Sequence, residues 1–476
     1  MIKLIRADKN RISFSLDENY TGTVRVRAYS PATKEELLLG EADAVSHGGG
    51  FELDRFAFGR DGAFLRYETQ LGGMKYVSHI SSEYDEPYPD PGTKKGLQIV
   101  DVEDAKYLGV KHAALNIAIT DVMRSACDPG AEPFEYDGHT YYINMPHIRE
   151  HDARIKELTD AGVVITFILL CGRWHTVAPE KIKSVLYHPD YDPEGTLSAF
   201  NVQTDEGIRH YQAFCAFLAR RYYRPDKKYG RVVGMIISNE VTAQWIWGNA
   251  GEKTCAEFAY EYVTAMRVAY LASKSVYQHF RTYISLDHFW GMSMDANHPR
   301  RFYSGLELLG EIRGRAQAEG DFYYNIAHHP YPEDLTKPDF WNDKTATDDY
   351  NTPRVTFKNL HILAEFLYKE ENLFEGKRRR VILSEQGFNS CWTDESEILQ
   401  ATAYGRAYHE VMKIPEIDSF ILHAHHDNAG EFGLNLGLWR RNKDKPGMER
   451  PKPVYYLFKA IDQKDESGEK YVWERF

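Results

Sequence analysis

The stretch VGMIISNE at residues 233–240 is an apolar run that ends in Glu240, and VILSEQGF at residues 381–388 repeats this arrangement around Glu385. Nearly continuous apolar runs are typical of parallel strands that are buried on both faces. A carboxylate directly behind such a strand is costly to bury unless it faces an open mouth. The two stretches therefore predict parallel strands of an α/β fold whose ends carry functional groups.

From about residue 74 the chain alternates strand, loop and helix through eight units. Apolar runs predict the strands, and apolar residues at three- and four-residue spacing predict the helices. Eight such units in a row predict a closed (β/α)8 TIM barrel. The runner-up is an open doubly wound sheet, but no glycine-rich nucleotide turn follows an early strand. The expected strands are Lys75–Ile80, Lys111–Ile119, Val163–Leu170, Val232–Ser238, Arg281–Asp287, Phe322–His328, Val381–Ser384 and Ser419–His423, and the expected helices are Val102–Leu108, Ile148–Ala161, Asp205–Tyr222, Glu252–Val276, Tyr303–Glu319, Val355–Glu371, Ser396–Met412 and Pro453–Ile461.

Residues 1–73 follow a different pattern, in which apolar and polar residues alternate with a period of two. Gly, Asn, Asp and Pro separate these short segments, as in antiparallel sheets. We expect a small N-terminal β-sandwich-like module, with Gly72-Gly73 as the boundary and residues 74–476 as the barrel. The module shows no recognisable platform of aromatic side chains, which favours packing against the barrel over ligand binding.

Composition excludes several classes of protein. The net charge of −12 argues against nucleic acid as a partner and against binding to an anionic membrane surface. The five cysteines are scattered and contain no CxxC pair, so neither a disulfide framework nor a zinc ribbon is indicated. The first residues lack the apolar core of a secretion signal, and no apolar run is long enough to cross a bilayer. These features favour a cytoplasmic protein.

Glu240 and Glu385 close the fourth and seventh expected strands. In a ring of eight strands these two ends face each other across the mouth, where such barrels place their chemistry. Two facing carboxyl groups about 5–5.5 Å apart are what a retaining glycosidase needs, one as a proton donor and one as a nucleophile. Burial and mutual repulsion can separate the pKa values of such a pair.

In these motifs the chain resembles clan A of the retaining (β/α)8 glycosidases, also called the 4/7 superfamily, over roughly residues 74–462. The resemblance implies that Glu240 is the acid/base and Glu385 the nucleophile. It implies that Asn239 hydrogen-bonds the 2-hydroxyl of the sugar. His329-Pro330-Tyr331 matches the His-x-Tyr of the clan, whose tyrosine orients the nucleophile. It further implies a covalent glycosyl-enzyme intermediate, a carbohydrate substrate, and neither cofactor nor metal.

The sequence departs from the clan at two strand ends. Many members carry an arginine after strand two, where this chain has Asn116 as the candidate substrate ligand. Many have a tryptophan that closes strand eight, for which Trp439 in the following loop is the candidate substitute. The end of strand three often contributes a histidine, which here is His175. His79 is the corresponding candidate after the expected first strand.

Loop aromatics and histidines supply the remaining candidates for sugar binding. Trp245, Trp247 and Trp290 follow strands four and five, where their rings could stack on sugar faces. Several histidines gather at the ends of strands six and eight, and among them His425 is expected to hydrogen-bond sugar hydroxyls.

Three other functions remain open at this point. A metal-dependent hydrolase would use the ends of strands six and eight, since His and Asp are metal ligands. A non-catalytic carbohydrate-binding protein would keep the fold without turnover. A transglycosidase would use the same two glutamates with a sugar as acceptor. The residues of the metal alternative are His328, His329, His423, His425, His426 and Asp427.

Overall fold

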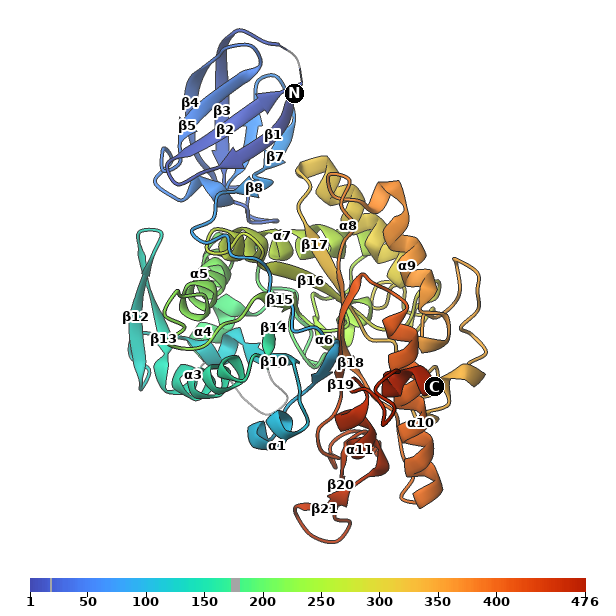
Figure 1. Ribbon diagram of the computed structural model, residues 1–476. Coiled ribbons are helices and arrows are strands. Elements are labelled where there is room, and N and C mark those ends of the chain that lie inside the picture. Colours follow the sequence, from blue (N-terminus) through green and yellow to red (C-terminus); the bar gives the residue numbers. More distant parts are fainter. Residues whose placement is uncertain (18, 173–179) are drawn as a thin grey trace.

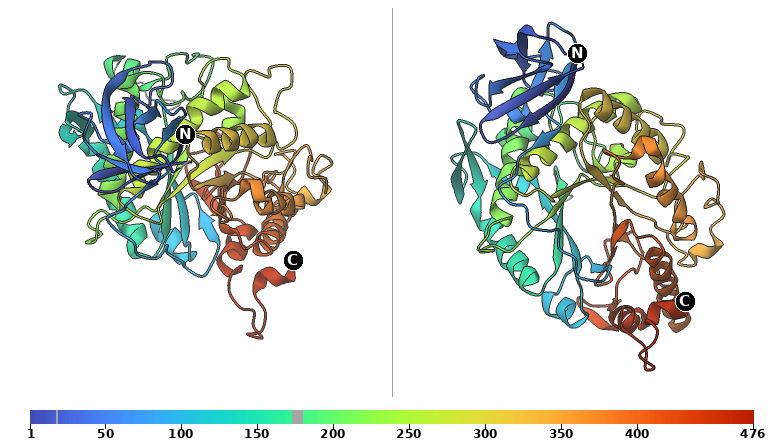
Figure 2. Two further views of the ribbon diagram at one scale, coloured as in Figure 1. Left: turned by 90° about the horizontal axis from the view of Figure 1, so that it is seen from above. Right: turned by 45° about the horizontal axis from the view of Figure 1, so that its top comes forward.

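A computed structural model describes residues 1–17, 19–172 and 180–476. The chain forms a small β-module that lies on one side of a larger barrel (Figures 1 and 2). The module consists of two four-stranded sheets, ordered β5-β2-β1-β8 and β4-β3-β6-β7. The strands are β1 (Ile2–Ala7), β2 (Arg11–Leu16), β3 (Gly22–Tyr29), β4 (Leu38–Ser46), β5 (Gly50–Asp54), β6 (Arg66–Thr69), β7 (Met74–Tyr76) and β8 (His79–Ile80).

The alternating pattern of the first residues explains the core of this module. In β2, Ile12 and Phe14 are buried while Arg11 is exposed. The ring of Phe14 stacks on Phe51 of β5 with centroids 4.5 Å apart, and its edge meets Tyr67 of β6 at 5.1 Å. One apolar face of each sheet therefore packs between the two layers, as the period of two predicts.

The barrel is closed by eight parallel strands in the order β10-β14-β15-β16-β17-β18-β19-β9. This ring confirms the predicted fold class. Its strands are short and almost wholly buried, which explains why they read as apolar runs. They are β9 (Lys95–Leu97), β10 (His112–Ala118), β14 (Val164–Leu170), β15 (Gly234–Ile237), β16 (Arg281–Leu286), β17 (Tyr324–His328), β18 (Val381–Gln386) and β19 (Ile417–Leu422).

The prediction that Lys75–Ile80 forms the first barrel strand was wrong. Within that segment β7 pairs with β6 and β8 pairs with β1, so both strands belong to the sheets of the module. The module thus continues past residue 73, and the true first barrel strand is β9. β9 has only three residues, two of which are a lysine and a glycine, and so it gives little apolar signal.

Helices surround the barrel (Figure 2). They are α1 (Val102–Tyr107), α2 (Ile119–Val122), α3 (Met145–Asp160), α4 (Glu180–Leu186), α5 (Asp205–Tyr222), α6 (Gln244–Trp247), α7 (Cys255–Lys274), α8 (Gly305–Glu319), α9 (His361–Tyr368), α10 (Asp394–Met412) and α11 (Pro453–Ala460). The helix expected over Val355–Glu371 is shorter, because Asn359 caps a separate turn with its side chain. None of the helices described is long and apolar enough to cross a membrane.

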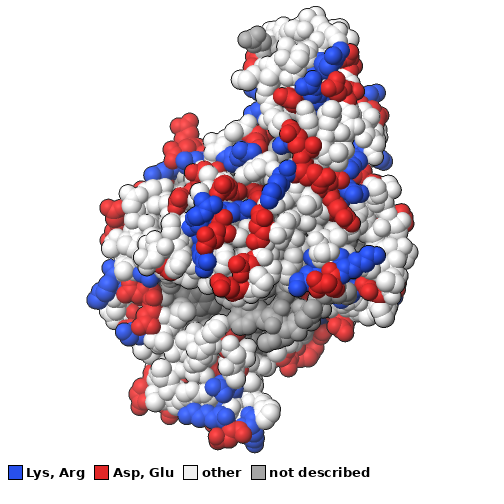
Figure 3. Space-filling model, turned by 180° about the vertical axis from the view of Figure 1, so that it is seen from behind, with Lys and Arg blue, Asp and Glu red and all other residues white. Residues whose placement is uncertain are grey.

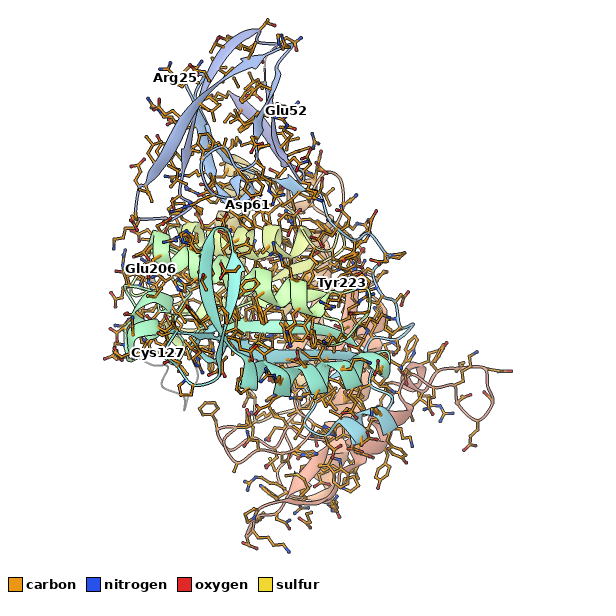
Figure 4. The ribbon with its side chains drawn as sticks, turned by 90° about the vertical axis from the view of Figure 1, so that its left-hand side faces the viewer. Arg25, Glu52, Asp61, Cys127, Glu206 and Tyr223 are labelled. Atoms are coloured by element: carbon orange, nitrogen blue, oxygen red, sulfur yellow. The ribbon has the colours of Figure 1, made fainter. Side chains whose placement is uncertain are left out.

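Two β-hairpins escaped the sequence prediction. One is formed by β12 (Ala131–Tyr136) and β13 (His139–Asn144), to which β11 (Met123–Arg124) adds a third strand. The other is formed by β20 (Trp439–Arg441) and β21 (Met448–Pro451). The first reaches the module, since the backbone N–H of Asp61 donates to Asp137 Oδ1 at 2.7 Å (Figure 4).

A partly buried ion pair joins the module to the barrel. Arg60 donates from both Nη1 and Nη2 to the two carboxylate oxygens of Asp205, at 2.6 and 2.8 Å. Ser30 also donates to Asp205, at 2.6 Å. The backbone N–H of Asp205, at the start of α5, donates to Glu35. These bonds fix the module against α5, because a bidentate Arg–carboxylate pair is geometrically demanding.

We expect Arg60→Ala to destabilise the protein by about 2 kcal/mol, less than the roughly 3–5 kcal/mol of a fully buried pair, because Asp205 keeps Ser30 and Arg209. The control is Arg25→Ala, which removes an exposed pair with Asp43 and should leave the stability nearly unchanged, because solvent screens surface ion pairs. Thermal unfolding by calorimetry measures both. Equal losses in the two variants would show that the Arg60 pair does not secure the module.

Candidate active site

The two glutamates predicted from the sequence meet at one end of the barrel. Glu240 follows β15, and Glu385 lies near the end of β18. The nearest carboxylate oxygens of the two residues are within 4.8 Å of each other, and a ring nitrogen of His329 lies within the same distance of both. This separation is short enough for both carboxyl groups to contact one carbon atom between them.

The backbone around Glu240 adopts an uncommon conformation. Ser238 and Glu240 both have left-handed φ angles, 64° and 36°. The N–H of Glu240 donates to Ser285 Oγ on the next strand at 2.9 Å, and Ser238 Oγ donates to the carbonyl of Trp247. Left-handed conformations of non-glycine residues store strain and cluster at functional sites. Here the surrounding bonds hold the turn that aims Glu240 at the pocket.

His329 connects the fourth and seventh strands. Its Nδ1 lies 2.9 Å from Glu240 Oε1, and its Nε2 lies 2.9 Å from the hydroxyl of Ser384, the neighbour of Glu385. The ring is only 1% exposed. Burial lowers the pKa of His329, but the hydrogen bond and charge of Glu240 together with the charge of Glu385 outweigh it and raise the pKa overall. The imidazole therefore holds Glu240 in place and carries positive charge more readily than a free histidine.

Two side chains donate to Glu385. The hydroxyl of Tyr331 donates to Oε1 at 3.3 Å, and the amide Nε2 of Gln98 donates to Oε2 at 3.2 Å. Gln98 directly follows β9, and Tyr331 follows β17. Burial raises the pKa of Tyr331 well above its ordinary value, and the charge of Glu385 raises it further. Tyr331 thus stays a hydrogen-bond donor, and the two partners hold the carboxyl oxygens of Glu385 in place.

The orientation of the Gln98 amide is fixed from the other side. His423 Nδ1 lies 2.7 Å from Gln98 Oε1, and His423 Nε2 lies 3.3 Å from Glu431. Burial lowers the pKa of His423, but Glu431 and the charge of Glu385 reverse this and raise the pKa overall. A protonated His423 donates to the carbonyl oxygen of Gln98, and so the NH2 group must point at Glu385.

Asp287 is a third acidic residue in the wall of the pocket. It follows β16, and its Oδ1 accepts from the N–H of Phe289 at 2.8 Å. Its Oδ2 is buried and has no partner among the described residues. Burial raises the pKa of Asp287, and the charge of Glu240 raises it further. A neutral carboxylic acid therefore stands beside Glu240.

These groups surround a cavity of about 910 Å³. Its acidic residues are Glu240, Asp287, Glu333, Glu385 and Glu431, and its polar residues include Asn116, Asn239 and Tyr331. The rest of its wall is largely apolar, with Trp247, Phe289 and leucines. Among the described residues that line it there is no lysine or arginine. A volume of this size holds a small organic ligand, and the mixture of apolar and polar groups suits a ring that carries hydroxyls.

Comparison with known proteins places this chain in a family. Residues 87–472 match the model of a family of unknown function, DUF5722. The chain belongs to the DUF5722 family. A search of curated proteins gives no match.

Several solved structures are similar to this DUF5722 protein at low sequence identity. A family 39 glycoside hydrolase from Bacteroides cellulosilyticus WH2 is 14% identical, with 96% of this chain and 82% of that one covered and a TM-score of 0.49. A β-glucosidase from Pyrococcus furiosus is 12% identical, with 75% and 82% covered and a TM-score of 0.47. A family 1 β-glucosidase from Thermotoga maritima is 11% identical, with 76% and 84% covered and a TM-score of 0.45.

The DUF5722 structure brings together a core set of the residues expected from the sequence. Glu240, Glu385, Asn239, Asn116, Trp247 and Tyr331 line the pocket. His329 lies behind its wall in contact with Glu240. His175 lies outside the described residues.

Five other expected residues lie elsewhere. His79 belongs to β8 of the module and faces Glu375. Trp245 is buried under Arg301, and Trp290 donates to the carbonyl of Tyr350 in the core. His425 and Trp439 both donate to Asp104, behind the wall of the pocket. The sequence could not separate these residues from the site, because a loop aromatic or histidine near a strand end is equally suited to packing between loops and helices.

The histidines considered as metal ligands have other partners. His425 Nδ1 accepts from the N–H of Val100, and its Nε2 contacts Asp104. His328 Nε2 contacts the carbonyl of Val355. Within the part of the chain that the structure describes, the group of three potential ligands found close together is Glu240, His329 and Glu385. Because protein groups already occupy these imidazoles, the arrangement does not favour the metal-dependent alternative.

Sequence reasoning missed Gln98, Asp287 and Glu431. Gln98 was hidden because β9 is too short to be recognised. Asp287 had a usable signal, since it ends an apolar strand in the same way as Glu240 and Glu385. Glu431 lies nine residues beyond β19, and only the tertiary fold returns it to the pocket.

The raised pKa of Asp287 makes stability depend on pH. Above pH about 4 the unfolded chain has released this proton while the folded protein still holds it. The free energy of unfolding therefore falls as pH rises toward the folded pKa. Asp287→Asn keeps the shape of the side chain but has no proton to lose. Its melting temperature relative to wild type should therefore rise with pH between pH about 4 and the folded pKa of Asp287.

Calorimetry at a series of pH values measures the effect. The control is Asp348→Asn, whose carboxyl is 92% exposed and whose difference from wild type should not change with pH in this way. If the melting temperatures of wild type and Asp287→Asn changed with pH in parallel, Asp287 would not be a buried neutral acid.

Proposed function

We propose that this DUF5722 protein is a retaining glycoside hydrolase that cleaves a β-linked sugar through a covalent glycosyl-enzyme. The observation that supports this most is the approach of the Glu240 and Glu385 carboxylates to within 4.8 Å inside one cavity. Retaining enzymes hold their two carboxyl groups about 5–5.5 Å apart, whereas inverting enzymes need about 6.5–9.5 Å to admit a water.

In the first step Glu385 attacks the anomeric carbon, and the bond from that carbon to the leaving oxygen breaks. Glu240 gives its proton to the leaving oxygen, so that the aglycone departs as a neutral alcohol. Tyr331 and Gln98 hold the two oxygens of Glu385 during the attack. Asn239 lies beside Glu240 in the wall and is placed to bond the 2-hydroxyl of the sugar.

In the second step a water enters where the aglycone left. Glu240, now a carboxylate, takes a proton from this water, and the hydroxide attacks the anomeric carbon while Glu385 leaves. Two inversions give a product with the configuration of the substrate. His329 keeps contact with Glu240 in both steps and so holds its carboxyl group beside the leaving oxygen and then beside the water.

The first test uses Glu385→Gln and Glu240→Gln with a panel of nitrophenyl glycosides and polysaccharides. The turnover of Glu385→Gln should fall to background, and the kcat/KM of Glu240→Gln should fall by about 10²–10⁴-fold. The control is Glu395→Gln, an exposed residue of α10, which should keep wild-type turnover. Full activity in either active-site variant would exclude the assignment.

Azide then separates the two roles. With Glu385→Gly, azide attacks the substrate once, and a β-glycoside should give the α-glycosyl azide. With Glu240→Ala, azide attacks the glycosyl-enzyme, and the β-glycosyl azide should form. Identification of the anomers by NMR checks both outcomes, and exchanged anomers would reverse the roles of the two residues.

Gln98→Leu removes a donor from Glu385 while the apolar replacement fills the space. We expect kcat to fall roughly 10–100-fold with a smaller change in KM, as for the loss of a hydrogen bond to a charged group. Steady-state kinetics on the best substrate of the panel measure this. The comparison variant is Asn116→Leu, which changes another polar residue of the pocket wall and should affect mainly KM. An unchanged kcat in Gln98→Leu would remove Gln98 from the mechanism.

A further inference from the structure

A second cavity of about 710 Å³ adjoins the active-site pocket. Gln98, His423, Asn428 and Glu431 line both cavities, so that they form the partition between them. The far side of the second cavity is the β20–β21 hairpin with its turn at residues 441–448. A chain of sugars that leaves the catalytic pocket over this partition would enter the second cavity.

The hairpin brings basic side chains to this cavity. Arg441, Lys443 and Lys445 line it, and none of the three forms an ion pair with a carboxylate of the described residues. The guanidinium of Arg441 and the Nζ of Lys443 lie over the ring of Trp392, at 4.8 and 4.6 Å from its centre. An aromatic ring holds a cation in place without neutralising its charge.

The other basic residues of the same hairpin behave differently. Arg440 and Arg450 both pair with Glu397, and Lys452 pairs with Asp427 at 2.8 Å. Charges of both signs are interspersed over the face seen in Figure 3. In a chain of net charge −12, three neighbouring cations without carboxylate partners repel one another and need a reason to be kept together.

Two further features concern how these cations are presented. Arg441 Nε is buried and has no hydrogen-bond partner in the described part of the chain. The turn that presents Lys443 and Lys445 is held by Asn442, whose backbone N–H and side-chain amide both donate to the carbonyl of Gly447. An unsatisfied buried donor beside a fixed turn is a site that an acceptor group can complete.

The two cavities differ in charge. The described lining of the second cavity holds three cations and three carboxylates, and two of the carboxylates are paired, Asp427 with Lys452 and Glu431 with His423. The catalytic pocket contains several carboxylates, and its described lining holds no lysine or arginine. An anionic sugar in that pocket would be repelled by these carboxylates. Beyond the partition, Arg441, Lys443 and Lys445 favour an anionic group.

We propose that the second cavity is a subsite for an anionic sugar unit, whose carboxylate or sulfate ester is bound by Arg441, Lys443 and Lys445. A neutral unit of the same oligosaccharide occupies the catalytic pocket. The glycosidic bond that is cut is the one that lies between the side chains of Glu240 and Glu385. This inference rests on the proposed glycosidase function, and it names the substrate class as acidic heteropolysaccharides. Met448 and Pro446 supply an apolar surface for the sugar ring in the same cavity.

The test measures binding by calorimetry to the Glu385→Gln protein, so that no probe is consumed. The carboxylate probe is a xylo-oligosaccharide with one glucuronate, compared with its carboxyl-reduced form. The sulfate probe is a carrageenan tetrasaccharide, compared with its desulfated form. At least one anionic probe should bind about tenfold or more tightly than its neutral counterpart, with a preference that shrinks as salt rises. The probe that shows the preference identifies the anion.

The variant Arg441→Gln/Lys443→Gln/Lys445→Gln should abolish that preference. The matched control is Lys3→Gln/Arg6→Gln/Lys9→Gln, which removes the same charges from exposed positions of the module and should leave it intact. Lys443→Glu/Lys445→Glu, confined to exposed turn residues, tests the same point if the triple variant does not fold. Equal binding of charged and neutral probes, or a preference that survives in these variants, would overturn the proposal.

Hydrolysis separates this inference from the function on which it rests. A preference for an anionic probe without hydrolysis of any glycoside would leave the subsite standing and remove the glycosidase. Hydrolysis of neutral substrates without any preference for an anionic probe would leave the glycosidase standing and remove the subsite.

Discussion

The site depends on one buried imidazole that joins two strands of the barrel. His329 contacts Glu240 on one side and Ser384 on the other, each at 2.9 Å, and so it fixes the spacing between the fourth and seventh strand ends. Because the ring is almost completely buried, neither contact can be exchanged for water without cost. This bridge therefore sets the separation of the two carboxylates.

Around the bridge the protein gives three carboxyl groups different environments. Glu385 receives donors from Tyr331 and Gln98, and Glu240 contacts a histidine of raised pKa. Asp287 is buried with one oxygen unpartnered and retains its proton. One pocket thus combines two hydrogen-bonded carboxyl groups with a buried carboxylic acid.

Much of the barrel could be predicted because its strands are buried on both faces and therefore read as apolar runs. β14, β16 and β19 were found within two residues by this signal. The same rule failed at β9, where three residues carry no pattern, and at β7 and β8, whose pairing partners lie in the module. Among site residues, the glutamates followed from their place behind apolar runs. The sequence did not show which of the candidate rings reach the pocket, since nothing local distinguishes a packed ring from one that faces a cavity. The rings that lie elsewhere are those of Trp245, Trp290, Trp439, His79 and His425.

The sequence by itself determined the class of fold, the order of the barrel strands after the first, and two carboxylates at facing strand ends. The periodicity of burial can be read locally from the sequence. The facing of the two strand ends follows from the order of strands in a closed ring. Only the tertiary structure decided which side chains reach the pocket, that Gln98 is oriented by His423 and Glu431, and that the β20–β21 hairpin brings unpaired cations beside it. Contacts between residues more than three hundred positions apart depend on how loops return over the barrel, and no local pattern of residue types encodes that path.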